Sequence, residues 1–162
     1  MKANLKYIGI VIALFVTLGM VQNASARDLI VVADKAVQND SKDWLGFLES
    51  KEIPVKLVTP ESFSEYQEEL YIFVLGSLDQ SDEIKKIAQD ALTDDEYKEI
   101  SKSSEGKMYY KPQAWNIGQK VILILGQNKN SLKEARIDTQ SEWYDMLKEW
   151  FDIEDTEGFH VY

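Results

Sequence analysis

Beyond residue 26, the chain alternates between short apolar runs and segments whose apolar residues recur with helical spacing. The apolar runs, rich in β-branched residues, predict strands at residues 29–33, 53–58, 70–75 and 121–125. Helical stripes follow them at residues 44–48, 60–69, 84–92 and 143–151, the first after the capping-rich segment 39–43. This order of strands and helices predicts an α/β fold.

Several polar residues are predicted to start the helices. Thr59 precedes a proline, which suits the first position of a helix. Ser77 with Gln80, and Ser131 with Glu134, have the spacing of a capping box. We therefore expect the third helix to begin after Ser77 and the long final helix to begin after Ser131.

The segment 93–118 is the least regular part of the pattern. Residues 97–100 and 108–111 read as two short strands on either side of the Ser- and Gly-containing loop 101–106. A hairpin inserted between parallel βα units makes the sheet mixed. The sequence thus predicts a three-layer α/β sandwich with a mainly parallel, mixed sheet of four to six strands.

The first 26 residues have the pattern of an export signal peptide. Lys2 and Lys6 precede an apolar stretch at residues 8–21, and Ala24-Ser25-Ala26 is a small-residue cleavage motif. We therefore expect a signal at 1–26, a single α/β domain at 27–151 and an acidic tail at 152–162. The predicted location is outside the cytoplasm: secreted, at the cell surface or periplasmic. The alternative is a chain anchored by an uncleaved N-terminal helix.

Composition narrows the choice of partners. The chain of 162 residues has a net charge of −10 and no cysteine, which excludes disulfides and thiolate metal sites. Cleavage of the signal would remove two lysines and no acidic residue, so the exported chain would be still more acidic. Such a charge disfavours nucleic acid and anionic lipid surfaces. Cationic partners, divalent ions and neutral glycans remain open.

Catalytic and cofactor motifs are weakly represented in the sequence. Gly76 and Gly126 each stand alone between a strand and a helix, whereas phosphate loops need further glycines, so we interpret them as structural joints. His160, the only histidine, lies in the predicted tail. We therefore predict no catalytic residue, no metal ligand and no cofactor. The acidic run 94–96 leaves a carboxylate-pair hydrolase as the alternative, although residues after Thr93 also suit a helical cap.

Two groups of residues are candidates for binding. In parallel α/β sheets the ligand crevice lies at the carboxyl ends of the strands. The polar residues predicted to gather along that edge are Asp34, Lys35, Thr59, Ser77, Gln127 and Asn128. Three aromatic residues in the irregular segment form the second group, suited to sugar stacking or protein contact: Tyr109, Tyr110 and Trp115.

Two families share short patterns with this chain. The pattern Trp115-Asn-x-Gly-Gln-Lys-Val-x4-Gly126-x4-Ser131-x3-Ala135 resembles a unit of surface-layer and related envelope proteins, mostly archaeal. Residues 71–150 are similar to the non-catalytic α/β domain that precedes the barrel in hexosaminidases and α-glucuronidases, although the glycine of its hairpin is missing at Glu96-Tyr97 and the insertion 101–118 is longer. Neither matched pattern contains catalytic residues.

The resemblance implies a mixed-sheet α/β sandwich in a cell-envelope setting, with scaffolding or accessory binding as its role. Our functional expectation is therefore an exported, non-enzymatic module that binds another envelope protein or a glycan. The alternative is a small exported hydrolase of glycosidase type. We expect no nucleic-acid partner and no membrane insertion after signal cleavage, and the sequence leaves the oligomeric state open.

Overall fold

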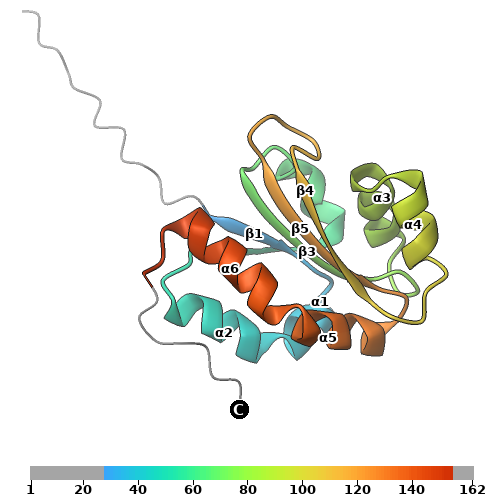
Figure 1. Ribbon diagram of the computed structural model, residues 1–162, viewed down its shortest axis with the longest axis horizontal. Coiled ribbons are helices and arrows are strands. Elements are labelled where there is room, and N and C mark those ends of the chain that lie inside the picture. Colours follow the sequence, from blue (N-terminus) through green and yellow to red (C-terminus); the bar gives the residue numbers. More distant parts are fainter. Residues whose placement is uncertain (1–27, 155–162) are drawn as a thin grey trace, which may run out of the picture.

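The computed structural model describes residues 28–154 (Figure 1). The predicted export signal and residues 155–162 of the predicted acidic tail lie outside this range. No helix within residues 28–154 is long and apolar enough to cross a membrane.

The fold is built on a five-stranded sheet with the order β2-β1-β3-β5-β4. The parallel strands are β1 (Leu29–Val32), β2 (Val55–Val58), β3 (Tyr71–Ser77) and β5 (Lys120–Gly126). The edge strand β4 (Lys107–Pro112) runs antiparallel to β5. The predicted α/β class and the mainly parallel, mixed sheet are confirmed.

Helical elements cover both faces of this sheet (Figure 1). The first face packs against α1 (Lys35–Asp40), α2 (Lys42–Ser50), α5 (Lys129–Asp138) and α6 (Gln140–Phe151). The second face packs against the 3-10 helix η1 (Pro60–Glu65), α3 (Asp82–Ala91) and α4 (Asp94–Ile100).

Alternate residues of each inner strand enter different cores. In β1, Leu29 and Val31 belong to the core on the α2–α6 face, whereas Ile30 and Val32 belong to the core on the α3 face. A strand buried on both faces needs apolar residues at every position, which is why these strands are continuous apolar runs in the sequence.

The core beneath α2 and α6 is strongly aromatic. Trp143 is fully buried and meets Trp44 and Phe73 edge-on, with ring centroids 5.7 and 5.8 Å away. Edge-to-face pairs of this kind stabilise beyond the area that they bury. These contacts fix both helices against the central strand β3, and they confirm the apolar stripe predicted at residues 143–151.

The prediction of a strand at residues 97–100 was wrong, because these residues form the end of α4. A complete capping box starts that helix: the Thr93 hydroxyl accepts from the Glu96 N–H, and the Glu96 carboxylate accepts from the Thr93 N–H at 2.8 Å. Ile100 then points into the core as a helical residue. The strand predicted at 108–111 is confirmed as β4, and it pairs with β5 instead of with a strand at residues 97–100.

Several predicted helix boundaries were also wrong. The N-cap of α3 is Ser81, because Ser77 still belongs to β3 and pairs with Gly126. The predicted long final helix is two helices, α5 and α6, which are separated at Thr139. The N-cap of α5 is Asn128, which makes Ser131 its third residue. The first helical segment already begins at Lys35, and the segment after Thr59 is a short 3-10 helix.

The two glycine joints are required by close packing. A methyl group on Gly126 would lie 2.8 Å from the Cα of Leu132 and would also collide with that residue's backbone nitrogen. At Gly76 it would lie 2.8 Å from the Cδ1 of Ile84. Neither glycine has a positive φ angle. Both glycines are therefore structural joints, but the reason is close packing and not a special backbone conformation. The missing side chain lets a helix approach its strand.

We expect Gly126→Ala to destabilise the fold by about 1–3 kcal/mol, because the backbone of α5 must move to admit the methyl group. Gly46 is the matched control: it lies inside α2 with no atom within 4 Å of an added Cβ. Gly46→Ala should stabilise the chain by about 0.5–1 kcal/mol through helix propensity. Urea unfolding of both variants measures this contrast, and equal effects would contradict the packing role of Gly126.

Candidate functional site

The carboxyl edge of the sheet contains the topological switch point of the fold. The chain passes from β1 to β2 on one side and then returns to β3 on the other side of β1. The helices that follow β1 and β3 therefore diverge to opposite faces, which is the arrangement at which ligands bind in open α/β sheets. All six polar candidates predicted from the sequence lie at or just beyond strand ends along this edge.

Two of these candidates are helix caps. The Asp34 carboxylate accepts from the Val37 N–H at 2.9 Å and so caps α1. The Asn128 side-chain oxygen accepts from the N–H groups of Asn130 and Ser131 at 2.9 and 3.1 Å. The Ser131 hydroxyl accepts from the Asn128 N–H in return. The capping role of both side chains therefore accounts for their position.

Two further candidates, Lys35 and Thr59, both act on the carboxylate of Glu61. Lys35 is the exposed first residue of α1, and Thr59 precedes η1. A hydrogen bond with the Thr59 side chain, a backbone hydrogen bond and the positive charge of Lys35 lower the pKa of Glu61. This group is exposed and stays ionised at neutral pH.

The last pair lies at the ends of β3 and β5. The Asp79 N–H donates to the Gln127 carbonyl at 3.0 Å, which extends the strand pairing past Gly126. The Ser77 hydroxyl and the Gln127 side-chain oxygen are both buried and have no hydrogen-bond partner within residues 28–154. By alternation along β3, the Ser77 side chain shares a face with Leu75.

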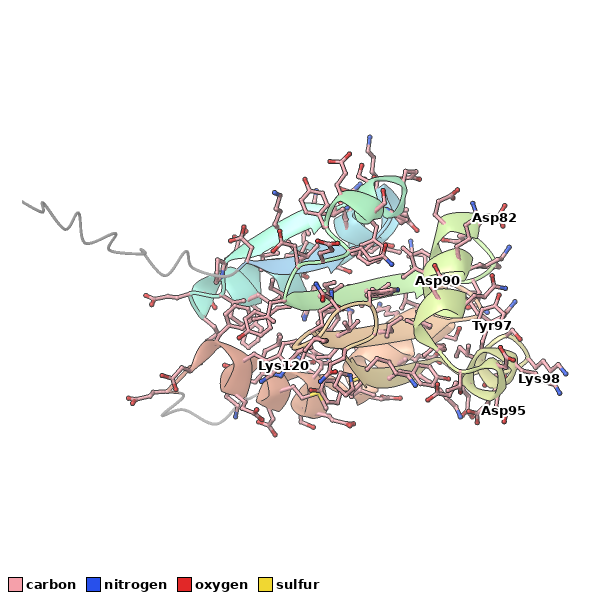
Figure 2. The ribbon with its side chains drawn as sticks, turned by 90° about the horizontal axis from the view of Figure 1, so that it is seen from above. Asp82, Asp90, Asp95, Tyr97, Lys98 and Lys120 are labelled. Atoms are coloured by element: carbon pink, nitrogen blue, oxygen red, sulfur yellow. The ribbon has the colours of Figure 1, made fainter. Side chains whose placement is uncertain are left out.

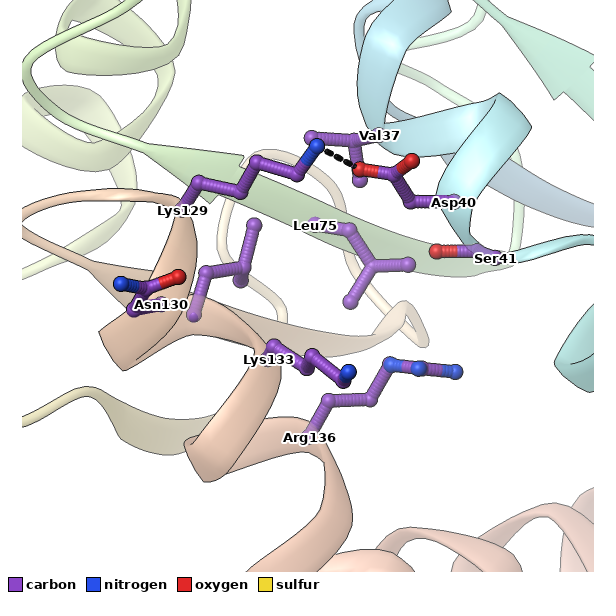
Figure 3. A pocket seen from close by; sticks show the side chains of 9 residues that line it. Val37, Asp40, Ser41, Leu75, Lys129, Asn130, Lys133 and Arg136 are labelled. Atoms are coloured by element: carbon purple, nitrogen blue, oxygen red, sulfur yellow. Dashed lines mark ion pairs between the residues drawn. The ribbon is translucent and has the colours of Figure 1, made fainter.

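A pocket of about 300 Å³ opens on that face, between α1 and α5 (Figure 3). We call it the α1–α5 pocket. Its lining comprises Val37, Asp40, Ser41, Leu75, Lys129, Asn130, Leu132, Lys133 and Arg136. Three basic residues and one acidic residue therefore surround an apolar floor.

The charges in the α1–α5 pocket are only partly paired. Lys129 reaches across from α5 to form an ion pair with Asp40 of α1 (Figure 3). Lys133 and Arg136 have no ion pair with any residue of the described range 28–154. Burial lowers the pKa of Arg136, and the negative charge of Asp43 opposes this shift, so the guanidinium remains charged at neutral pH.

These basic residues were missed in the sequence because their spacing is that of an ordinary exposed helix face. Lys129, Lys133 and Arg136 follow one another at intervals of four and three residues. The available signal was that all basic residues of this helix lie on one of its faces, in a chain that is strongly acidic. Only the packing of α1 beside α5 turns this face into the wall of a pocket.

The three candidate aromatic residues do not form one surface. Tyr109 and Trp115 pack against the core on the α3 face, where Trp115 meets Phe63 with a centroid distance of 5.1 Å. Tyr110 points to the other face, toward Trp150. Burial, with the nearby charges of Glu99 and Glu96, raises the pKa of Tyr109 to about 12.

The Trp-Asn turn that carries the surface-layer resemblance is held by Gln119, a buried residue that the sequence analysis did not single out. Its side-chain oxygen accepts from the N–H groups of Trp115 and Asn116, both at 3.1 Å. Its amide nitrogen donates to the Gln67 and Glu69 carbonyls. One side chain thus ties the β4–β5 connection to the segment before β3.

Acidic residues gather at α3 and α4, well away from Lys120 (Figure 2). There the pKa of Glu96 is lowered, chiefly by its hydrogen bond with Lys111, and that of Asp82 by its hydrogen bond with Lys85. Within residues 28–154, no three His, Cys, Asp or Glu side chains are grouped so that they could hold a metal ion.

Comparison with known proteins adds no relative: no protein-family model, curated sequence or solved structure matches the chain.

We expect Asn128→Ala to lower the free energy of unfolding by about 1 kcal/mol, because it removes the N-cap of α5. Lys35→Ala, which removes an exposed side chain at the same sheet edge, should change stability by no more than about 0.5 kcal/mol. Thermal or urea unfolding distinguishes the two. A neutral Asn128→Ala would show that the side chain does not serve as a cap.

Gln119→Leu should destabilise the chain by about 2 kcal/mol, because four part-buried N–H and C=O groups lose their partner. Gln119→Glu keeps the acceptor oxygens but cannot donate to the two carbonyls. Urea unfolding should rank the wild type above Gln119→Glu. A Gln119→Leu variant as stable as the wild type would contradict the bridging role.

Proposed function

We propose that this chain is an exported, non-enzymatic module of the cell envelope that binds another envelope component, a protein or a glycan, at the carboxyl edge of its sheet. The observation that carries this proposal is the α1–α5 pocket, a basic recess in a strongly acidic chain. The envelope setting rests on the signal-like pattern of residues 1–26 and on the surface-layer resemblance around Trp115.

The chemistry of this edge supports binding over hydrolysis. A carboxylate-pair hydrolase needs two acids facing each other across a cleft, one of them with a raised pKa. At this edge Asp34 caps a helix and Asp40 pairs with Lys129. The acidic run at residues 94–96 starts α4, where Glu96 completes a capping box and pairs with Lys111. Asp34, Asp40 and Glu96 therefore each have a structural partner that a catalytic role would have to displace.

At this edge some polar groups are held by structural hydrogen bonds and others have no such partner, and this combination also suits a binding site. Caps and strand pairing hold the backbone around the pocket rigid, so a ligand would meet a preformed surface. The basic side chains of Lys133 and Arg136, which extend from this frame, form no ion pair within residues 28–154 and remain available to a partner.

The test is to express the full chain with a C-terminal tag, crosslink it in intact cells and fractionate them. We expect the protein in the envelope or the medium, with a mass that fits cleavage after Ala26 and a reproducible crosslinked partner. The purified partner should then bind the isolated protein saturably. A cytoplasmic, uncleaved protein would contradict the proposal. So would turnover of glycoside substrates that is lost when a carboxylate is substituted.

A further inference from the structure

The α1–α5 pocket has a charge opposite to that of the rest of the chain. The chain carries a net charge of −10, yet three cations and one acid line this recess. The three basic side chains come from a single face of α5, and Figure 3 shows them extending from that helix into the space beside α1. A local positive field in an acidic protein attracts anions and disfavours cations.

Arg136 is the least expected member of this group. Its side chain is partly buried, yet it forms no ion pair with any residue between 28 and 154, and Asp43 attracts it only from beyond ion-pair distance. Taking a charge out of water without a partner costs stability. Its guanidinium has five N–H donors in a planar arrangement that matches carboxylate and phosphate oxygens. An anionic ligand would supply the missing partner.

The remaining lining defines the size and character of the ligand. Val37, Leu75 and Leu132 are buried apolar residues, and Ser41 and Asn130 contribute polar groups beside them. A volume of about 300 Å³ lies at the lower end of the range for small-molecule sites. This combination suits a compact molecule with a carbon skeleton and one strongly anionic group.

We propose that the α1–α5 pocket binds a compact organic anion, whose carboxylate or phosphate group is held by Arg136 and Lys133 while its carbon skeleton lies on Leu75 and Leu132. This inference rests on the proposed binding function and names the ligand class of that site. Asp40 acts as an internal competitor, because it already occupies Lys129 through an ion pair that spans the pocket. A ligand that engages Lys129 must displace this carboxylate.

Isothermal titration of the full chain with four small probes tests the proposal. D-glucuronate and glycerol phosphate carry the two anionic groups, and glucose and glycerol are their neutral counterparts. We expect saturable binding of at least one anion and none of the neutral compounds. The stronger of the two anions identifies the group as a carboxylate or a phosphate.

Three variants assign the binding to this pocket. Arg136→Gln should weaken anion binding about tenfold or more, because it removes charge-assisted hydrogen bonds. Lys133→Gln, at an exposed position where folding is not at risk, should weaken it by a smaller factor. Asp40→Asn should strengthen it by up to about fivefold, because Lys129 is released from its competitor. Lys98→Gln is the control, since Lys98 is an exposed cation on α4 (Figure 2), which packs on the other face of the sheet from α1 and α5.

The result that overturns the inference is an absence of saturable anion binding, or equal losses in Lys133→Gln and Lys98→Gln. Urea unfolding of every variant separates loss of binding from loss of fold. If the envelope partner still binds Arg136→Gln and Lys133→Gln at wild-type affinity, the pocket inference fails while the binding function stands. If there is no envelope partner but anions bind, the proposed envelope function fails and the pocket inference stands.

Discussion

The central strand β3 is buried along its whole length, and this burial dictates the arrangement of the other elements. Its side chains alternate between two cores, so each face of the sheet must be covered by helices. Phe73 serves the first core, where it packs between Trp44 and Trp143, with ring centroids 5.1 and 5.8 Å away. Ile72 and Val74 serve the second core beneath α3. The connection after β1 lies on the first face and those after β2 and β3 lie on the second, which is the arrangement that creates a switch point beside β3.

The same constraint creates the candidate site. A helix that covers a buried strand has to approach it closely, and Gly126 permits α5 to do so directly after β5. Asn128 then caps α5, which sets the position of the basic residues that follow it. Because α1 follows β1 on the same face, α5 and α1 become neighbours above Leu75, and Lys129 can reach Asp40. The pocket is therefore a consequence of the strand order, and its charge is a property of the α5 sequence.

Sequence patterns predicted the sheet better than the helices. Continuous apolar runs have few alternatives to a strand buried on both faces, and the three of this kind are β1, β3 and β5. The fourth predicted strand, β2, contains Lys56 and is a partly exposed edge strand. Helix starts were harder, because Ser77 has capping-box spacing with Gln80 but still pairs with Gly126 in the sheet, and Ser81, which is followed by Ile84 at that spacing, caps α3 instead. The strand prediction at residues 97–100 failed for a related reason: a Tyr and an Ile favour a strand, while the capping box of Thr93 and Glu96 directly before them favours a helix. The candidate site required packing between helices distant in sequence, and no local pattern contains that information.

Arg136 shows how structure and function compete within this small site. Its backbone carbonyl accepts from the Trp143 indole N–H at 3.1 Å, so the backbone of this residue helps to fix the aromatic core. Its side chain does the opposite, since a partly buried guanidinium loses hydration without forming an ion pair within residues 28–154, and the more distant charge of Asp43 only opposes the resulting shift. A neutral or apolar side chain would keep the backbone contact and avoid that cost. Because the Arg136 side chain lowers the stability that its backbone supports, folding does not explain the choice of arginine at this position. Ligand binding in the basic α1–α5 pocket would explain it.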